Sequence, residues 1–165
     1  MSNGYTLVLV DVQPDAPWGY LVTNQLLDGC EREVVTAIEF EYPVVATDVA
    51  YWSINDDWYG PTDKRLMQHL KGYEFYSQCP KMATSDGAYN VLGVCQHDNF
   101  GTDHFVVVGV RGNGCVIAMV EGLRREIPGC RITVVQDACN EDPELTDWSA
   151  FEQIEGVELV TRHAR

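Results

Sequence analysis

The stretch His104–Glu126, HFVVVGVRGNGCVIAMVEGLRRE, decides the fold of this 165-residue chain. It opens with the apolar run Phe105–Val108, whose composition is typical of a strand buried on both faces of a parallel sheet. A glycine-rich turn follows, and the apolar spacing after that turn predicts a helix. Cys115 therefore lies where a strand gives way to a helix. In open α/β sheets, ligands bind in this crevice at the carboxyl ends of the strands.

Two interpretations of Cys115 follow from this position. A thiol at the start of a helix faces the unpaired N–H groups of the first turn, whose partial positive charge favours the thiolate. This makes Cys115 a candidate nucleophile. The alternative is that Cys115 is a small buried apolar residue, as most free cysteines are.

Strands and helices alternate along the rest of the chain. Apolar runs predict strands at residues 5–10, 43–47, 73–78, 105–108, 131–136 and 157–161. Helical spacing predicts helices at about residues 19–40, 62–71, 88–96, from 116 onward, and 143–154. Within them, Gly29 is a point where the first helix could break, and Thr62 and Asp142 are expected helix caps. The alternation predicts an α/β fold: one domain over residues 1–165, with a doubly wound, Rossmann-like sheet of about six mainly parallel strands and helices on both faces.

Composition excludes several classes of partner. The chain has 11 Lys and Arg against 25 Asp and Glu, a formal net charge of −14, and the acids are scattered. This argues against nucleic acids and anionic membranes, whose phosphates need clustered basic residues. No apolar run is long enough to span a membrane, and the start of the chain has the character of a first strand and not of a signal peptide.

The six cysteines form no CxxC motif and no zinc-finger spacing, so a zinc knuckle or a thioredoxin-type site is not expected. Without a secretory signal, the thiols are expected to stay reduced in a cytoplasmic protein.

Three ionisable residues fall at predicted strand ends: Asp11, Lys81 and Cys115. Right-handed crossovers bring the carboxyl ends of parallel strands to one edge of the sheet. An ammonium ion lowers the pKa of a nearby thiol, and a carboxylate can take the thiol proton and later return it to a leaving amine. Taken singly, Asp11 could cap a turn and Lys81 could be a surface charge. Together the three predict a catalytic site.

At this point the sequence resembles the isochorismatase-like cysteine hydrolases, which include nicotinamidases, carbamoylsarcosine amidases and isochorismatases. The resemblance covers nearly the whole chain. It rests on Lys81 and on the segments LVLVDVQPD (7–15), SDGAY (85–89), VVVGVRGNGCVIAMVEGL (106–123) and RITVVQDAC (131–139).

The resemblance implies that Asp11, Lys81 and Cys115 form the catalytic triad of this family. It also implies a cis peptide between Val110 and Arg111, which would place the N–H groups of Arg111 and Cys115 in an oxyanion hole. The residues expected around the substrate pocket are Gln13, Tyr51, Trp52, Val110 and Arg111. The aromatic segment that holds Tyr51 and Trp52 could instead form a lid or a subunit contact.

The chain departs from the family in two places. Nicotinamidases carry an acid and histidines after the second strand that hold a divalent metal, but here Asp48 is followed by no histidine before residue 69. We therefore predict no metal and no other cofactor. The second departure is Arg111, where the family has a small residue. Its side chain could clamp a substrate carboxylate, plug the pocket or point to solvent. The four histidines are expected on the surface or in satisfied core positions: His69, His97, His104 and His163.

The sequence thus predicts an amidohydrolase that acts without a metal on a small amide or ureido-type substrate through a Cys115 thioester. Two alternatives remain open: a vinyl-ether hydrolase of the isochorismatase type, and a catalytically silent α/β domain for binding or assembly. The expected partners are a small-molecule substrate and further copies of the same chain, as a dimer or tetramer.

Overall fold

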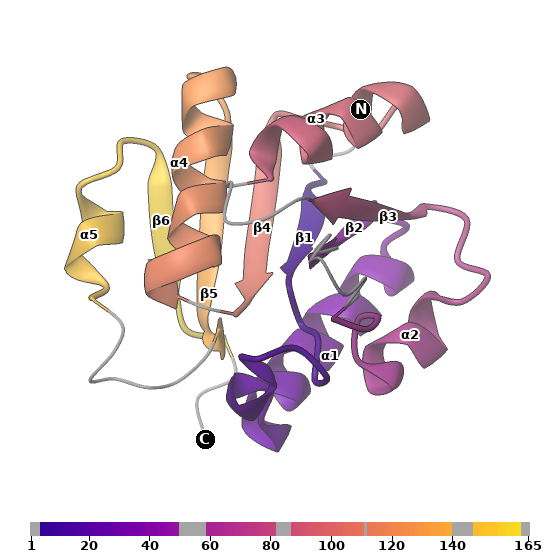
Figure 1. Ribbon diagram of the computed structural model, residues 1–165. Coiled ribbons are helices and arrows are strands. Elements are labelled where there is room, and N and C mark those ends of the chain that lie inside the picture. The colour runs from indigo at the N-terminus through magenta and orange to yellow at the C-terminus, as the bar shows by residue number, and fades with distance from the viewer. Residues whose placement is uncertain (1–3, 50–58, 82–86, 111, 140–146, 163–165) are drawn as a thin grey trace, which may run out of the picture.

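The core of the molecule is a six-stranded sheet in which every neighbouring pair of strands is parallel (Figure 1). The computed structural model describes residues 4–49, 59–81, 87–110, 112–139 and 147–162. The strand order is β3-β2-β1-β4-β5-β6. The bounds are β1 Thr6–Val10, β2 Val44–Val49, β3 Tyr76–Lys81, β4 His104–Gly109, β5 Arg131–Cys139 and β6 Val157–Val160.

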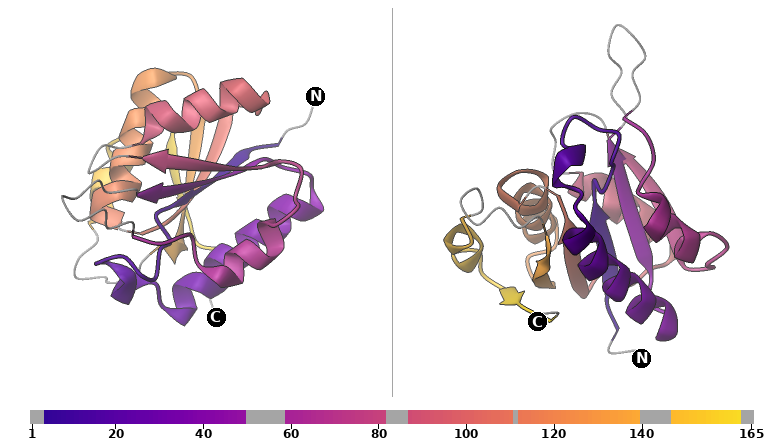
Figure 2. Two further views of the ribbon diagram at one scale, coloured as in Figure 1. Left: turned by 45° about the vertical axis from the view of Figure 1, so that its right-hand side comes forward. Right: turned by 90° about the horizontal axis from the view of Figure 1, so that it is seen from below.

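Helices cover both faces of this sheet (Figure 2). On one face lie α1 (Asn24–Glu39) and α2 (Lys64–Leu70), and on the other lie α3 (Ala88–Asp98), α4 (Ile117–Glu126) and α5 (Ser149–Glu152). Two short helical turns, η1 (Gly19–Leu21) and the wide turn η2 (Gly112–Val116), precede α1 and α4. The predicted fold class, a doubly wound parallel sheet, is confirmed.

Burial on both faces explains why the central strands are continuously apolar. Every residue of β1 is buried, and so is β4 apart from its first residue. Alternate side chains of these strands enter two separate cores, one under α1 and α2 and the other under α3, α4 and α5. The strands therefore lack the apolar–polar alternation of a sheet with one face in water.

The connections place a switch point between β1 and β4. The chain leaves β1 toward α1 on one face and leaves β4 toward α4 on the opposite face. The two strands are adjacent and parallel, with Val10 paired to Gly109 at their carboxyl ends. Beyond these ends the two connections diverge and leave a crevice, which is where open α/β sheets bind ligands.

The glycine that could have broken the first helix does not break it. Gly29 lies inside α1, and a Cβ atom there would come within 2.5 Å of the main-chain oxygen of Asp137. The absent side chain lets α1 lie directly against the end of β5. Gly29 is therefore a close-packing residue and not a helix break.

Several predicted boundaries move. The N-cap of α2 is Asp63, which accepts a hydrogen bond from the Arg65 N–H, and Thr62, the predicted cap, lies one residue earlier. β3 continues through Pro80 to Lys81, which an edge strand tolerates because a proline there removes no bond from the sheet interior. Of the helix predicted at residues 143–154, the structure describes only its end, as α5. Its expected cap at Asp142 lies outside the described residues.

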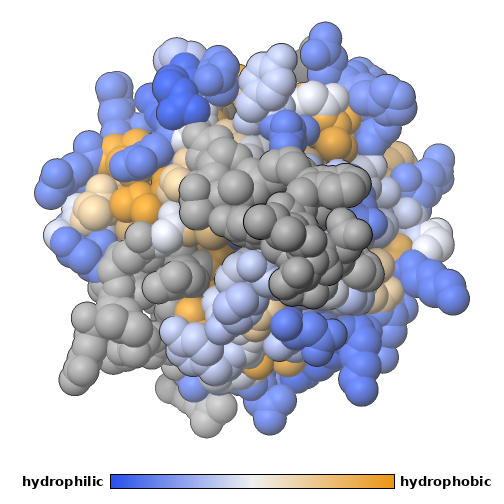
Figure 3. Space-filling view, viewed as in Figure 1, coloured by the Kyte–Doolittle hydropathy of each residue, from blue (hydrophilic) through white to orange (hydrophobic). Residues whose placement is uncertain are grey.

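One face of the molecule shows the character of its surface. On the face shown in Figure 3, the described residues are mostly hydrophilic, and apolar residues form small separate patches. Among the described residues, no helix has both the length and the apolar character needed to cross a membrane.

Candidate active site

The structure brings Asp11, Lys81 and Cys115 together at the carboxyl edge of the sheet. Asp11 follows β1, Lys81 is the last residue of β3, and Cys115 lies in η2 just before α4. The Lys81 Nζ atom lies 2.8 Å from Asp11 Oδ2, and both side chains are almost completely buried, with exposed fractions of 0% and 1%. The Cys115 thiol lies close enough to both charged groups for their charges to act on its pKa. Three residues, the outer two of which are 104 positions apart in the sequence, thus lie close together.

Asp11 is held in an uncommon backbone conformation. Its φ is +50°, a left-handed value that a residue other than glycine rarely adopts without support. The support comes from both sides. The Asp11 N–H points to the main-chain and hydroxyl oxygens of Thr47, each at 3.2 Å, and the Asp11 carbonyl accepts hydrogen bonds from the Gln13 N–H and the Trp18 indole.

Thr47 also fixes the carboxylate itself. The Thr47 hydroxyl donates to Asp11 Oδ1 at 2.7 Å, which leaves Oδ2 to face Lys81. Asp11 is therefore more than a turn cap, because its two carboxylate oxygens have different partners. Sequence analysis missed this role of Thr47. The sequence did contain a signal for it, because Thr47 is a polar residue near the end of β2, the strand beside β1.

Lys81 is not a surface charge. Its side chain is completely buried, and Gly87 makes room for it, since a Cβ atom at Gly87 would lie 2.8 Å from Lys81 Cδ. Within the described ranges, neither Lys81 Nζ nor Asp11 Oδ2 has a regular hydrogen-bond partner, so their close contact with each other is an ion pair of poor hydrogen-bond geometry. Such a pair survives burial only when the two charges stay together.

The thiol of Cys115 differs electrostatically from the sequence prediction. Its pKa is raised to about 11, first by burial and then by the negative charge of Asp11, while Lys81 acts in the opposite direction. The expectation that the helix start and Lys81 would favour a resting thiolate is therefore wrong. At neutral pH the sulfur therefore carries its proton, and the Asp11 carboxylate is close enough to act on it.

Access to the three residues is uneven. All six cysteines are free, and Cys115 alone among them is partly exposed. Asp11 and Lys81 are closed off from solvent. A molecule that enters the site therefore meets the sulfur before either charge.

The loop that carries Cys115 crosses close above the end of β1. Gly109 has φ +126°, and a Cβ atom there would come within 2.2 Å of the Val10 oxygen. The next residue donates its N–H to the same oxygen at 2.9 Å. Only glycine permits this approach, which brings the start of η2 beside Asp11.

Two of the predicted pocket residues support the scaffold. Gln13 is fully buried, and its amide donates to the oxygens of Val49 and Gly60 and accepts from the Val49 N–H, so no donor remains for a ligand. Val110 packs into the core under α1. The other three predicted residues, Tyr51, Trp52 and Arg111, lie outside the described residues, and so does the Val110–Arg111 peptide.

The described residues do not form the acid-and-histidine site of a metal-dependent enzyme. Asp48 accepts hydrogen bonds from Thr62, at 2.6 Å, and from Gln78, and burial raises its pKa. In the described part of the chain, no three acidic, histidine or cysteine side chains cluster as metal ligands would. The described histidines have other partners: His69 with Glu31, His97 with Asp98 and His104 with Thr133. His163 lies outside the described residues, and the absence of a metal stays a prediction.

No family model matches the sequence, and no curated protein sequence is similar enough to count as a relative. Solved structures give a clear answer on the fold. N-carbamoylsarcosine amidase from Thermoplasma acidophilum superposes with a TM-score of 0.74 at 19% identity, covering 96% of each chain. The nicotinamidase SaPncA from Staphylococcus aureus reaches 0.78 at 13% identity, over 99% of this chain and 100% of that one.

The chain has the isochorismatase-like hydrolase fold. Other neighbours with this fold are described as isochorismatase-family hydrolases. The YcaC gene product from Escherichia coli, an octameric hydrolase of unknown specificity, has a TM-score of 0.70 at 20% identity, over 96% of this chain and 76% of that one. The sequence resemblance predicted this isochorismatase-like architecture, and the superpositions confirm it.

Proposed function

We propose that the chain is a cysteine hydrolase that cleaves a C–N bond of a small amide or ureido-type compound. Cys115 is the nucleophile, Asp11 the general acid and base, and Lys81 the electrostatic support. One observation carries the proposal: a buried carboxylate–ammonium pair lies close to the one partly exposed thiol. Burying two charges is unfavourable unless they remain paired, and the position of this pair beside a thiol gives it a chemical use.

The first half of the reaction forms a thioester. As the sulfur attacks the substrate carbonyl, its proton passes to Asp11, so the raised pKa of the resting thiol is not an obstacle. The carbonyl oxygen becomes an oxyanion, for which the N–H groups of Cys115 and Arg111 are the proposed donors. Asp11 then gives its proton to the departing nitrogen, which leaves as ammonia or an amine.

The second half releases the acid. Asp11, again a carboxylate, takes a proton from water as the water oxygen attacks the thioester carbonyl. When the tetrahedral intermediate collapses, the carbon–sulfur bond breaks, the sulfur recovers a proton from Asp11 and the free acid departs. Throughout both halves, Lys81 stabilises the negative charge that moves between Asp11 and the sulfur.

The direct test combines a substrate panel with trapping of the intermediate. Ammonia release would be measured with small primary amides and ureido compounds, and rapid-quench mass spectrometry would search for an acyl group on Cys115. We expect release that disappears in Cys115→Ala, and a mass increase on one peptide. Conversion of a vinyl ether that survives in Cys115→Ala would favour the isochorismatase-type alternative. No turnover combined with slow, equal labelling of all six cysteines would favour the silent domain.

The remaining expectations belong to the same proposal. The substrate is a small molecule, since the acidic composition opposes nucleic acids. The enzyme works without a metal, in the cytoplasm, and assembles as a homo-oligomer. Octameric assembly of the Escherichia coli neighbour supports a search for self-association by light scattering.

A further inference from the structure

A second cavity lies at the opposite end of the sheet from Cys115. Its volume is about 780 Å³, and its walls come from the segments that enter four strands, β1 to β4. Five aromatic rings line it, contributed by four segments of the chain: Tyr5, Tyr42, Phe75, Phe100 and His104. None of these residues takes part in the proposed hydrolysis.

Three of the aromatic rings pack against one another. The Tyr5 ring lies 4.7 Å from the Tyr42 ring and 5.8 Å from the His104 ring, centroid to centroid. The loop on the other side is tied down, because the Thr6 hydroxyl donates to the Gly101 oxygen at 2.7 Å. All five rings are only partly buried, so each keeps some surface available to an occupant.

The charged residues that line this cavity are all acidic. Glu41, Asp98 and Asp103 line it, and no lysine or arginine is among its lining residues. The pKa of His104 is lowered by burial and by Arg131, so its ring adds no positive charge at neutral pH. Two opposing charges lie outside the lining. Arg131 contacts His104 Nδ1 at 3.2 Å, and the charge of Arg162 acts on Tyr5 and His104.

Two helices end at this cavity. α1 ends at Glu39, two residues before Glu41, and α3 ends at Asp98, so the negative ends of both helix dipoles lie at its edge. This contribution is independent of the carboxylates. Aromatic faces, carboxylates and helix carboxyl ends all favour the same kind of occupant, a cation with an apolar body.

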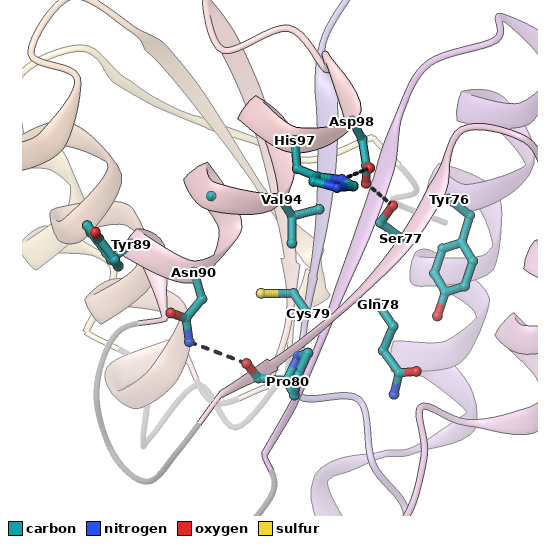
Figure 4. Close-up of a pocket in the computed structure, with 11 residues that line it drawn as sticks. Tyr76, Ser77, Gln78, Cys79, Pro80, Tyr89, Asn90, Val94, His97 and Asp98 are labelled. Carbon is teal, nitrogen blue, oxygen red and sulfur yellow. Dashed lines mark hydrogen bonds and ion pairs between the residues drawn. The ribbon is translucent and has the colours of Figure 1, made fainter.

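A neighbouring groove lacks this combination. The groove between β3 and α3, of about 660 Å³, is shown in Figure 4. In it Asp98 bonds to Ser77 and His97, and Asn90 donates to the Pro80 oxygen. Tyr76, Tyr89 and His97 line this groove, but Asp98 is its one acidic residue and is already bonded. The groove also has only the end of α3 and not that of α1.

We propose that the cavity at the amino-terminal edge of the sheet binds a small organic ammonium ion. The ammonium group would lie against the rings of Tyr42 and Phe100, within the field of Asp103 and Glu41. The site is separate from Cys115 and does not depend on the hydrolase proposal. The charge of the occupant is the essential property, so a neutral molecule of the same shape should bind much more weakly.

The test uses choline and its neutral isostere 3,3-dimethyl-1-butanol as probes. Each would be titrated into the ¹⁵N-labelled full-length protein, with amide shifts followed by NMR. We expect saturable shifts at Tyr42, Phe100 and His104 for choline, and at least about tenfold weaker binding for the neutral probe, the effect of losing a desolvated cation–π contact and its charge. Equal binding of both probes, or shifts confined to the surroundings of Asp11 and Cys115, would overturn the proposal.

Variants make the test specific. Phe100→Leu and Asp103→Asn should each weaken choline binding about three- to fivefold, because each removes one ring or one charge. Glu121→Gln, on the exposed face of α4, removes the same charge elsewhere and should leave binding unchanged. Cys115→Ala should also bind choline normally. If Phe100→Leu and Asp103→Asn remain folded by circular dichroism and bind choline like the parent protein, the site is not this cavity.

Discussion

The molecule contains two sets of ion-paired side chains with very different surroundings. Lys81 and Asp11 are completely buried and pair with each other. Arg65 joins α2 to α1 through Asp28 and Glu31, in side chains that remain 23–43% exposed. The surface group is the better satisfied of the two, because Arg65 uses two nitrogens and Glu31 also contacts His69.

This difference in exposure bears on what each set of ion pairs contributes. An exposed ion pair contributes little to stability, since water already solvates its members. A buried pair adds little net stability either, but removing one partner leaves the other charge stranded. The pair of Lys81 and Asp11 is therefore a poor way to hold strands together and a good way to keep a carboxylate charged beside a thiol. The predictions below separate these two uses.

The largest effect is expected from Lys81→Met. It leaves the Asp11 carboxylate buried without its counter-charge, which should lower the free energy of unfolding by about 3–5 kcal/mol. Hydrolysis should be lost as well, because the stranded carboxyl takes up a proton and ceases to be a base. Urea unfolding at pH 7 would measure the first effect. The double variant Asp11→Asn/Lys81→Met should recover most of the lost stability but no activity, and a single variant that costs under about 1 kcal/mol would contradict the buried-pair interpretation.

Gly87→Ala tests the space reserved for Lys81. The added methyl group would meet Lys81 Cδ at 2.8 Å and strain a φ of +70°. We expect a loss of about 2–3 kcal/mol, combining the left-handed strain with overpacking, and a strong fall in turnover. Gly72→Ala is the matched control, since Gly72 also has a positive φ, of +84°, but nothing within 4 Å of the added atom. It should lose about 1 kcal/mol and keep full activity. Equal losses in both variants would show that Lys81 is not constrained by Gly87.

Thr47→Val tests how Asp11 is aimed. The variant keeps the shape of the side chain but removes the hydroxyl that donates to Asp11 Oδ1. Stability should fall by about 1–2 kcal/mol, the typical effect of leaving a buried acceptor unpaired. The turnover number should fall more than the Michaelis constant changes, because Thr47 is completely buried. Thr47→Ser should restore both. A Thr47→Val variant with normal turnover and a normal pH profile would rule out this positioning role.

The alkylation of Cys115 by iodoacetamide tests its electrostatics. With a pKa raised to about 11, the thiolate fraction at pH 8 is about one in a thousand, so labelling should be slow and should rise with pH up to that value. Asp11→Asn removes the negative charge that raises the pKa, so the labelling rate at pH 8 should increase, about tenfold, although hydrolysis is lost. Mass spectrometry of the labelled peptides gives the rate at each cysteine. An unchanged rate in Asp11→Asn would mean that the charge of Asp11 does not act on the sulfur.

The sequence was sufficient for the parts of this site that depend on chain order. Apolar runs located the strands, and the rule that parallel strands share a carboxyl edge brought Asp11, Lys81 and Cys115 together. It was insufficient for features set by contacts between distant side chains. The hydrogen bond from Thr47 crosses between strands 36 residues apart, and the packing of Gly87 on Lys81 depends on a side-chain path.

The wrong prediction for the Cys115 pKa also arises from contacts that the sequence does not show. The sequence shows that an ammonium, a carboxylate and a helix start are near the thiol, but their relative weights depend on burial and distance. In the folded chain burial has the largest effect and the Asp11 charge the next largest, both in the direction opposite to the one predicted. Boundary errors, such as the extension of β3 through Pro80, are of another kind. They arise because an edge strand accepts residues that an inner strand excludes.

The smallest effect is expected at the surface group. Arg65→Met removes the contacts with Asp28 and Glu31 but leaves every charged side chain in water, so the free energy of unfolding should fall by no more than about 1 kcal/mol. Hydrogen bonds from Arg65 and His69 lower the pKa of Glu31, so this contribution is present above the unfolded pKa of Glu31 and disappears as the pH falls through its folded value. It should also shrink in 1 M salt. Lys64→Met in the same helix is the control, because Lys64 forms no ion pair with any described residue. An Arg65→Met loss that approached the Lys81→Met loss would remove the distinction between the two groups, because exposure would then not decide what an ion pair contributes.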